Sequence, residues 1–532
     1  LDRLVALRDR VHMREAAELY ESLEAKKLAI PPYAKAAAAD AYLYLEQPEK
    51  ARNLYREALK TASAGDRAEL PDWQIGLMYA YNEAEQHDEA QALADRLLGE
   101  TPTMGNKGVR GVEEPNEDYS RVAVMSALVR QYAERLEEAE QRLGKLRAEA
   151  PFNSDVRSAW ASLQSARERP RAALDEYSLL QIDDPQSIPA AVGRGESLLA
   201  LNEFSEAKAL LPPLLADAAE DKAVQSFSRK LDLYDTPHLR AETTIGRGAA
   251  IAGAEAVFDV ALHSAPLTHT LGDAYRVFAH VSRSQGRAET ATASRETVFR
   301  TRTGAGINYR SRHVTAEVQA NRAINAAKKS GGAAGLTLTP SDALSAQVTL
   351  DTNVNDLPAV AYRNNVTAKA LKLNLAWASH ESRKIGGDLS RARYSDQNVR
   401  DEARLWWTER WLSGPVFKLD TTLTVYGSKN SDGPREYFNP RRDRQADFTV
   451  SGEWLSARRY DRSFRQRVAL TRGQYRQDGF RSGAAADVHY EHEWNRDKER
   501  TLRYGLGRSF HPYDGVRENR NYGYVALNWN LK

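Results

Sequence analysis

The hydrophobic periodicity of this chain changes once, near residue 235, and no other sequence feature constrains the fold as strongly. Before that point, apolar residues recur at positions i, i+3, i+4 and i+7, as on one face of an amphipathic helix. After it, apolar and polar residues alternate, as in strands whose two faces meet different environments. We therefore predict an α + β multidomain protein, with a helical part at residues 1–235 and a strand part at residues 238–532.

The helical part contains an internal repeat that is marked by alanine. Six alanines occupy matching positions, with gaps of 35, 39, 49, 34 and 34 residues: Ala16, Ala51, Ala90, Ala139, Ala173 and Ala207. A period of 34 residues is typical of tetratricopeptide (TPR) repeats, each of which is a pair of helices. The spacing predicts an N-terminal α-solenoid of about six TPR helix pairs. The alternative is a helical bundle without repeats.

A TPR array coils so that the first helix of each pair lines a concave groove. Counting back from the alanines gives these candidates for the groove: Asp72, Tyr79, Asn82, Glu83, Gln131, Tyr132, Asp155, Ser162 and Glu196. Carboxylates, amides and tyrosines suit a polymer that carries hydroxyl groups or amines. The alternative for each residue is an ordinary solvated helix face.

The two parts carry opposite net charges that nearly cancel. Residues 1–237 contain 30 Lys and Arg against 42 Asp and Glu, a net charge of −12. Residues 238–532 contain 45 against 31, a net charge of +14, so the whole chain carries only +2. Such segregation indicates two functional parts, and an acidic groove would attract a cationic polymer.

Long segments of the strand part alternate strictly, for example 315–320, 344–350, 416–426, 464–475, 501–510 and 522–531. A soluble sandwich would place the polar face in water, whereas an outer-membrane barrel would place it in the lumen and the apolar face in lipid. The 295 residues from 238 to 532 accommodate about 16 membrane-spanning strands, enough for an aqueous channel. We therefore predict a C-terminal, ~16-stranded antiparallel transmembrane β-barrel.

Details of this barrel also follow from the sequence. Glycine-containing segments predict turns at Ser284–Gly286, Ser330–Gly332, Ile385–Asp388, 431–434 and Tyr513–Gly515. Arginine-rich strands are expected to line the lumen and to pair there with carboxylates. Examples are Arg465, Arg467, Asp443, Asp461, Glu491 and Glu493.

Residue types and motifs that carry chemistry are scarce in this chain. The absence of cysteine excludes disulfide scaffolds, thiolate metal sites and thiol nucleophiles. No phosphate-binding loop, H-E-x-x-H motif, G-x-S-x-G motif or nucleic-acid recognition module occurs. We predict that the chain is not an enzyme and uses no metal, cofactor or nucleic acid. The alternative from another class is an outer-membrane enzyme with a TPR docking platform, which would need a Ser/His cluster on one barrel face.

Five short segments carry a resemblance to a known family. They are Arg363–Ala368, which follows Leu357-Pro358, then Ser395–Arg400, Tyr437–Pro440, Arg459–Phe464 and Tyr513–Gly515. These segments, together with a TPR array before a barrel, resemble the export porins for poly-β-1,6-N-acetyl-D-glucosamine, the PgaA family. The resemblance adds candidates in the barrel lumen or loops: Asp396, Asn398, Arg400, Tyr437, Asn439, Tyr460, Asp461, Tyr513 and Asp514. Gln397 stands where the family's segment has glycine.

The resemblance implies a bacterial outer-membrane protein whose TPR domain lies in the periplasm. It implies export of partially de-N-acetylated poly-N-acetylglucosamine during biofilm formation, without catalysis or cofactor. The implied partners are this exopolysaccharide, a periplasmic polysaccharide deacetylase that binds the TPR domain, and outer-membrane lipid. The family's TPR region is longer, so we expect this chain to lack N-terminal repeats and a signal peptide. A TPR-barrel exporter of another exopolysaccharide, such as cellulose, is the alternative.

Overall fold

The computed structural model describes residues 1–532 except 106–112, 249–254, 290–294, 432 and 434. The chain divides into two compact units. The first comprises Leu1–Arg167, Ala172–Arg194 and Leu210–Phe227 and is helical apart from a two-stranded ribbon. The second comprises Glu168–Arg171, Gly195–Ala209 and Ser228–Lys532 and contains all the long strands.

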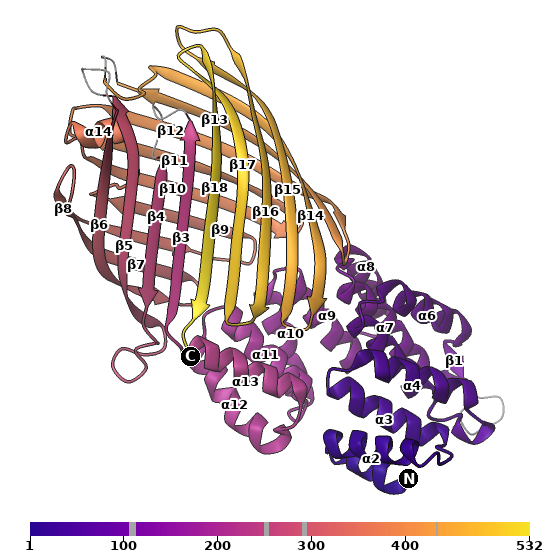
Figure 1. The fold of residues 1–532 in the computed structure, drawn as a ribbon. Helices are drawn as coiled ribbons and strands as arrows, with labels where there is room; N and C mark the ends of the chain where they lie inside the picture. Colours follow the sequence, from indigo (N-terminus) through magenta and orange to yellow (C-terminus); the bar gives the residue numbers. More distant parts are fainter. Residues whose placement is uncertain (106–112, 249–254, 290–294, 432, 434) are drawn as a thin grey trace. The chain divides into compact units, whose positions relative to one another are not determined.

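Helices α1 to α13 follow one another along the helical part of the chain (Figure 1). Their bounds are α1 (Asp2–Asp9), α2 (Met13–Ala25), α3 (Pro32–Tyr44), α4 (Pro48–Thr61), α5 (Leu70–Glu83), α6 (His87–Glu100), α7 (Glu117–Tyr132), α8 (Leu136–Glu149), α9 (Ser154–Ala166), α10 (Pro170–Asp183), α11 (Ile188–Ala200), α12 (Phe204–Ala218) and α13 (Lys222–Tyr234). A 3-10 turn (Ala64–Asp66) and the ribbon β1 (Met104–Gly105) and β2 (Glu114–Pro115) connect some of them.

The repeat predicted from the alanine spacing is confirmed. All six marker alanines are completely buried, and they lie in α2, α4, α6, α8, α10 and α12, the second helices of successive pairs. Close approach between pairs depends on glycine, because the ring of Tyr55 occupies the space that a Cβ would take at Gly76. Tyr177 of α10 and Gly193 of α11 repeat this arrangement three helix pairs later.

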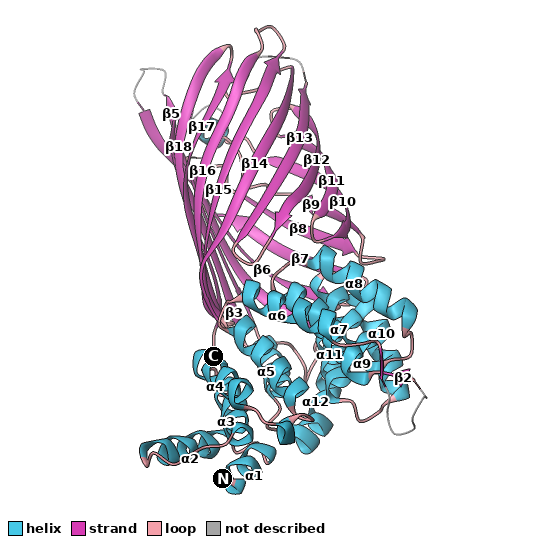
Figure 2. Ribbon diagram, turned by 90° about the vertical axis from the view of Figure 1, so that its right-hand side faces the viewer, coloured by secondary structure: helices cyan, strands magenta, loops and turns pink. Residues whose placement is uncertain are grey.

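Strands β3 to β18 form a closed antiparallel barrel of sixteen strands, as predicted, which closes where β18 pairs with β3. Figure 2 shows that the strands run obliquely around the barrel. Their bounds are β3 (His238–Gly248), β4 (Ala256–His263), β5 (Tyr275–Glu289), β6 (Arg295–Arg310), β7 (Val314–Ala323), β8 (Lys329–Leu338), β9 (Leu344–Asp351), β10 (Ala368–His380), β11 (Arg383–Tyr394), β12 (Val399–Ser413), β13 (Phe417–Asn430), β14 (Arg442–Arg459), β15 (Arg462–Gln477), β16 (Gly483–Asp497), β17 (Arg500–Tyr513) and β18 (Val516–Asn530). A short helix, α14 (Ala359–Arg363), lies between β9 and β10.

The two faces of the barrel wall differ in polarity. Leu405, Val425 and Phe448 are each at least half exposed, and they belong to an apolar band on the outer face. Their strand neighbours Arg404 and Tyr426 point the other way, into the lumen, because successive side chains alternate across a sheet. An apolar outer face and a polar, charged lumen are the reverse of a soluble barrel. In the described part of the chain, no helix is long and apolar enough to span a bilayer.

The connections differ between the two ends of the barrel. Three connections at one end consist of two residues each, 381–382, 460–461 and 498–499, and both ends of the barrel chain lie there. We call this the turn end. The opposite end, the loop end, carries the long segments 352–367 and 431–441. Outer-membrane barrels have short periplasmic turns and longer extracellular loops, so the loop end corresponds to the cell exterior.

Three of the predicted turns are wrong. Ser284–Gly286, Ser330–Gly332 and Ile385–Asp388 lie inside β5, β8 and β11. Gly386 makes room for a side chain on the lumenal face, since a Cβ there would overlap the ring of Trp406 on β12. Tyr513–Gly515 does form the β17–β18 turn, with Asp514 and Gly515 at positive φ, whereas residues 432 and 434 lie outside the described residues.

Candidate functional site

Helices α5, α7 and α9 of the helical unit carry most of the predicted groove residues. Asp72, in the first turn of α5, forms an ion pair with Arg121 of α7. This hydrogen bond, with weaker attraction from Asp118 and from Asp155 of α9, raises the pKa of Arg121 above its ordinary value. The rings of Tyr79 (α5) and Tyr132 (α7) lie 6.3 Å apart. Burial raises the pKa of both tyrosines, so their hydroxyl groups stay neutral donors.

Two further groove candidates lie beside this cluster. Gln131 donates a hydrogen bond of 2.9 Å to the hydroxyl of Ser162 and so ties α7 to α9. Glu83 lies near enough to Tyr132 to raise its pKa further. Seven of the nine candidates therefore share the cluster on α5, α7 and α9. The sequence did not single out Arg121, because a groove for a cationic polymer favours carboxylate, amide and hydroxyl groups over a guanidinium.

Two groove predictions need correction. Asn82 is 7% exposed, and its side-chain oxygen lies 3.1 Å from Nδ1 of His87, so it belongs to the interior of a helix pair. Glu196 forms an ion pair with Lys230 in the second unit and does not join the cluster on α5, α7 and α9. Counting from the alanines placed these residues on first helices but could not tell the groove face from the packing face.

One wall of the barrel lumen is rich in carboxylates. Phe448 of β14 and Val488 of β16 point outward, so residues an odd number of positions away on these strands point into the lumen. Six carboxylates occupy such positions: Asp443, Asp447, Glu453, Asp487, Glu491 and Glu493. Three of these are neutralised by arginines of β15 and β17. Arg467 lies 2.7 Å from Glu491 and also pairs with Glu453, and Arg465 lies 3.2 Å from Glu493. These arginines line the lumen beside carboxylates, as the alternation predicts.

The other three lumenal carboxylates have neutral partners. The hydroxyl of Tyr475 donates to Asp443 at 3.0 Å, and that of Tyr522 donates to Asp487 at 3.0 Å. Asp447 accepts hydrogen bonds of 2.8 and 3.0 Å from the side-chain amide of Gln445. Within the residues that the structure describes, no lysine or arginine forms an ion pair with any of the three. This wall therefore presents net negative charge that hydroxyl and amide donors hold in place.

Candidates from the family resemblance gather mainly at the loop end. Asn398 is 1% exposed and donates a hydrogen bond of 2.7 Å to Asn439. Tyr437 donates to Asp396 at 2.9 Å, so four of the candidates tie the segment 395–398 to the segment 431–441. Arg400 faces the lumen just below them and pairs with Glu402 at 2.8 Å.

The remaining four candidates occupy turns. Tyr513 packs against Phe438 with ring centroids 5.1 Å apart, and Asp514 accepts a hydrogen bond of 2.6 Å from Gln477, both at the loop end. Tyr460 and Asp461 form the β14–β15 connection at the turn end, far along the strands from the others, where Lys498 lies 3.3 Å from Asp461. These contacts assign the candidates structural positions, and a role for any of them in binding stays a prediction.

The segment 352–367 folds into the lumen at the loop end. It leaves β9 and contacts β5 and β6, since Asn355 donates a hydrogen bond of 2.9 Å to Ser282 of β5. Arg300, a lumenal residue of β6 that is 0% exposed, donates to the Val354 carbonyl at 2.8 Å and to Asn355 at 3.0 Å. The guanidinium of Arg300 lies over the ring of Tyr362 in α14, with Cζ 5.5 Å from the ring centroid. No sequence pattern singles out Arg300, because arginines occur on eleven of the sixteen barrel strands.

A closed barrel with an apolar outer band and a charged lumen defines an outer-membrane β-barrel of the porin class. Residues 237–531 match the family described as the PgaA membrane beta barrel domain. The chain therefore belongs to the PgaA barrel family and is an outer-membrane protein.

Over the described residues, no group of three or more His, Asp or Glu is arranged to hold a metal ion.

Relatives extend this likeness into the helical part. The poly-beta-1,6-N-acetyl-D-glucosamine export protein of Escherichia coli K12 is 26% identical over 532 residues, which covers 98% of this chain. The chain spans 64% of the length of that relative and of its counterpart in E. coli O157:H7. A solved structure described as a bacterial polysaccharide outer membrane secretin matches 56% of this chain and 99% of its own, with a TM-score of 0.51 and 21% identity. At that identity the likeness concerns the barrel fold.

Proposed function

We propose that this protein exports partially de-N-acetylated poly-β-1,6-N-acetyl-D-glucosamine across the bacterial outer membrane and so supports biofilm formation. The observation that carries the proposal is the pair of partly exposed lumenal carboxylates Asp447 and Asp487, whose hydrogen-bond donors are neutral, in a barrel of the PgaA family. Each deacetylated sugar carries an ammonium group, which these carboxylates attract.

The spacing of the carboxylates suits a moving polymer. Asp447 on β14 and Asp487 on β16 lie two strands apart, which places their Cα atoms about 10 Å apart around the wall. A chain with occasional ammonium groups can therefore exchange one weak contact for the next. Conduction requires sites that attract the cargo and still release it, and carboxylates held by neutral donors in a hydrated lumen meet that requirement.

The helical array would receive the polymer on the periplasmic side. Asp72, Glu83 and Asp155 lie around Tyr79 and Tyr132, a combination of charge, aromatic surface and hydroxyl donors that suits amino sugars. We also propose that a periplasmic polysaccharide deacetylase docks on this array, an expectation that rests on the family resemblance. The role needs no bond-making step from this chain.

Planar-bilayer recording with the full chain tests the export proposal. Glucosamine oligomers added on the turn-end side should reduce the ionic current, and fully N-acetylated oligomers of equal length should reduce it much less. Absence of any ion conductance would contradict an open channel. Equal block by charged and acetylated oligomers would contradict recognition by charge, and stronger block by cello-oligosaccharides would favour a cellulose exporter.

A variant of the helical face tests its part in binding. Changing Asp72 and Asp155 to Asn and Glu83 to Gln should weaken the binding of partially deacetylated oligomers by about tenfold at low salt, because three attractive charges are lost. Calorimetry measures the affinity. The control replaces Glu89, Glu137 and Glu149, exposed carboxylates of the second helices α6 and α8, by Gln. An equal loss of affinity in the control would mean that the oligomers respond to the net charge of the array and not to this cluster.

A further inference from the structure

The outer face of the barrel carries a concentration of cations near the loop end of β10 to β15. The outward positions there include Lys369, Arg391, Arg393, Lys429, Arg442, Arg444, Arg472 and Arg476. Each lies an even number of residues from an outward apolar side chain of its own strand, such as Leu389, Val425 or Phe448. Because every second side chain of a strand points to the same face, these cations also point outward. Asp401 is the carboxylate that shares this surface. The expectation that arginine-rich strands line the lumen is therefore wrong for this part of the wall.

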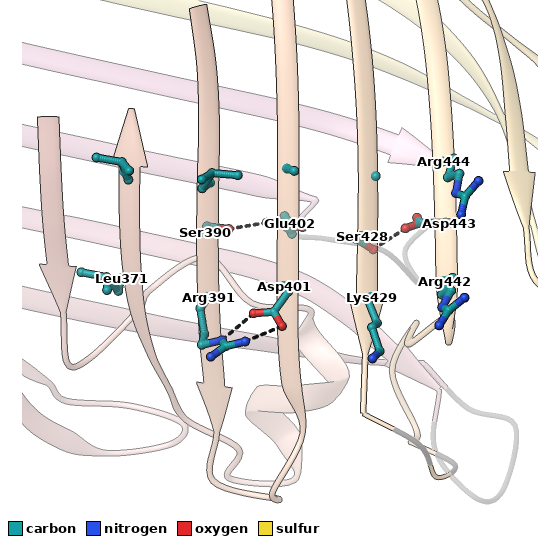
Figure 3. Close-up of a pocket in the computed structure, with 14 residues that line it drawn as sticks. Leu371, Ser390, Arg391, Asp401, Glu402, Ser428, Lys429, Arg442, Asp443 and Arg444 are labelled. Atoms are coloured by element: carbon teal, nitrogen blue, oxygen red, sulfur yellow. Dashed lines mark hydrogen bonds and ion pairs between the residues drawn. The ribbon is translucent and has the colours of Figure 1, made fainter. Parts of the chain in front are cut away.

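Strand register aligns several of these side chains in one row. Leu371 pairs with Arg391, Arg391 with Asp401, Asp401 with Lys429, and Lys429 with Arg442. Figure 3 shows Arg391, Asp401, Lys429 and Arg442 at one level on four neighbouring strands. Neighbouring strands lie about 4.8 Å apart, so this row, which we call the cationic row, extends about 14 Å around the barrel.

A hollow lies in the wall beside the cationic row. The next row toward the membrane centre consists of Leu373, Leu389, Ala403, Gly427 and Arg444. Ala403 and Gly427 are small, and a Cβ at Gly427 would meet no atom closer than 3.6 Å. The resulting open hollow has a volume of about 680 Å³ and is bordered by Leu389 on one side and Arg444 on the other. Apolar chains can lie there without displacing any side chain.

The charges of this surface are largely uncompensated. The guanidinium of Arg391 forms two hydrogen bonds with Asp401, at 2.6 and 2.8 Å. Across the described ranges, no comparable ion pair is found for Lys429, Arg442 or Arg444. A cation on the lipid-facing side of a barrel is unfavourable, increasingly so toward the middle of the bilayer. Anionic groups of the surrounding membrane are therefore the partners that this position requires.

We propose that the cationic row and the hollow bind a phosphorylated, multiply acylated glycolipid of the outer leaflet, the lipid A part of lipopolysaccharide. One phosphate lies on Lys429, Arg442 and Arg444, the other lies near Arg391 at the far end of the row, and the acyl chains lie over Ala403 and Gly427. The row spans four strands, which fits a disaccharide with a phosphate at each end better than a single-phosphate headgroup. The site lies on the opposite face of the wall from the lumen, so it goes beyond the export proposal and does not depend on the exported polymer.

Native mass spectrometry and thermal-shift titration of the full chain in mild detergent test this site. Bisphosphorylated lipid A should bind at least tenfold more tightly than the same glycolipid after chemical dephosphorylation. It should also bind at least tenfold more tightly than phosphatidylglycerol, and inorganic phosphate at millimolar concentration should give no thermal shift. Equal affinity for lipid A with and without phosphates, or for phosphatidylglycerol, would overturn the proposal. This comparison uses the unaltered protein and so does not depend on the folding of a variant.

A triple variant locates the site. Lys429→Gln, Arg442→Gln and Arg444→Gln together should lower the affinity for bisphosphorylated lipid A at least tenfold, with folding verified by heat-modifiable electrophoretic mobility. The control, Arg283→Gln, Arg322→Gln and Arg508→Gln, removes the same charge from outward positions on β5, β7 and β17 that are not neighbours. Unchanged affinity in the first variant, or an equal loss in the control, would overturn the assignment.

Discussion

Replacing Arg300 by alanine should raise the single-channel conductance about twofold or more, because it releases the segment 352–367 from the lumenal wall. The guanidinium of Arg300 holds this segment through the Val354 carbonyl, Asn353 and Asn355. Leu357, Ala361 and Tyr362 then pack against the wall beside it. Without the guanidinium, buried carbonyl and amide oxygens of the segment lose their donor, which favours its movement into water. Bilayer recording of the full chain measures the effect.

A second loop should limit this opening. Glu436, in the segment 431–441, contacts Arg363 at 3.2 Å and also bonds to Asn364, and Tyr437 belongs to the same apolar cluster. The effect of Arg300→Ala should therefore increase when Glu436→Gln is added. The matched control is Arg310→Ala, on the same lumenal face of β6 but at its turn end, where the described residues include no side-chain bond to residues 352–367. Unchanged conductance in Arg300→Ala would show that the segment holds its place without this residue.

The architecture was predictable because it depends on periodicity that the sequence displays directly. The alanine spacing reports the packing of helix on helix, where only a small side chain fits, and all six alanines prove fully buried. Alternation within the strands of residues 238–532 determines which side chains face lipid and which face the lumen. Strand number then follows from length, because a bilayer fixes how many residues each strand needs.

Side-chain neighbourhoods across strands were much less predictable. Gly386 appeared to mark a turn, yet it accommodates Trp406, a residue 20 positions away that only the strand register brings there. Likewise, alternation alone shows which residues of a strand share a face with an arginine. Whether that face is the lumenal or the outer one is known only when the apolar residues of the same strand are compared. Arg465 and Arg442 lie on adjacent strands and on opposite faces for this reason.

Removing the charge of Asp447 and Asp487 together should abolish most of the block by glucosamine oligomers. Asn keeps the size of each side chain, and the amide oxygen still accepts from Gln445 or Tyr522. Each carboxylate attracts an ammonium group at contact distance by about 1 kcal/mol in a water-filled lumen. Loss of two such contacts corresponds to about a thirtyfold rise in the half-blocking concentration at low salt. The difference should shrink at high salt, because exposed charges are screened.

The matched control separates a local site from the net charge of the lumen. Asp259→Asn with Asp388→Asn removes two lumenal carboxylates from β4 and β11, where His280 and Arg404 lie 2.8 and 2.7 Å away. Those carboxylates already have cationic or protonatable partners, so the block should change far less than in the Asp447 and Asp487 variant. Equal loss in both variants would mean that the polymer senses only the mean potential of the lumen. No loss in either would mean that the polymer does not follow the carboxylate wall.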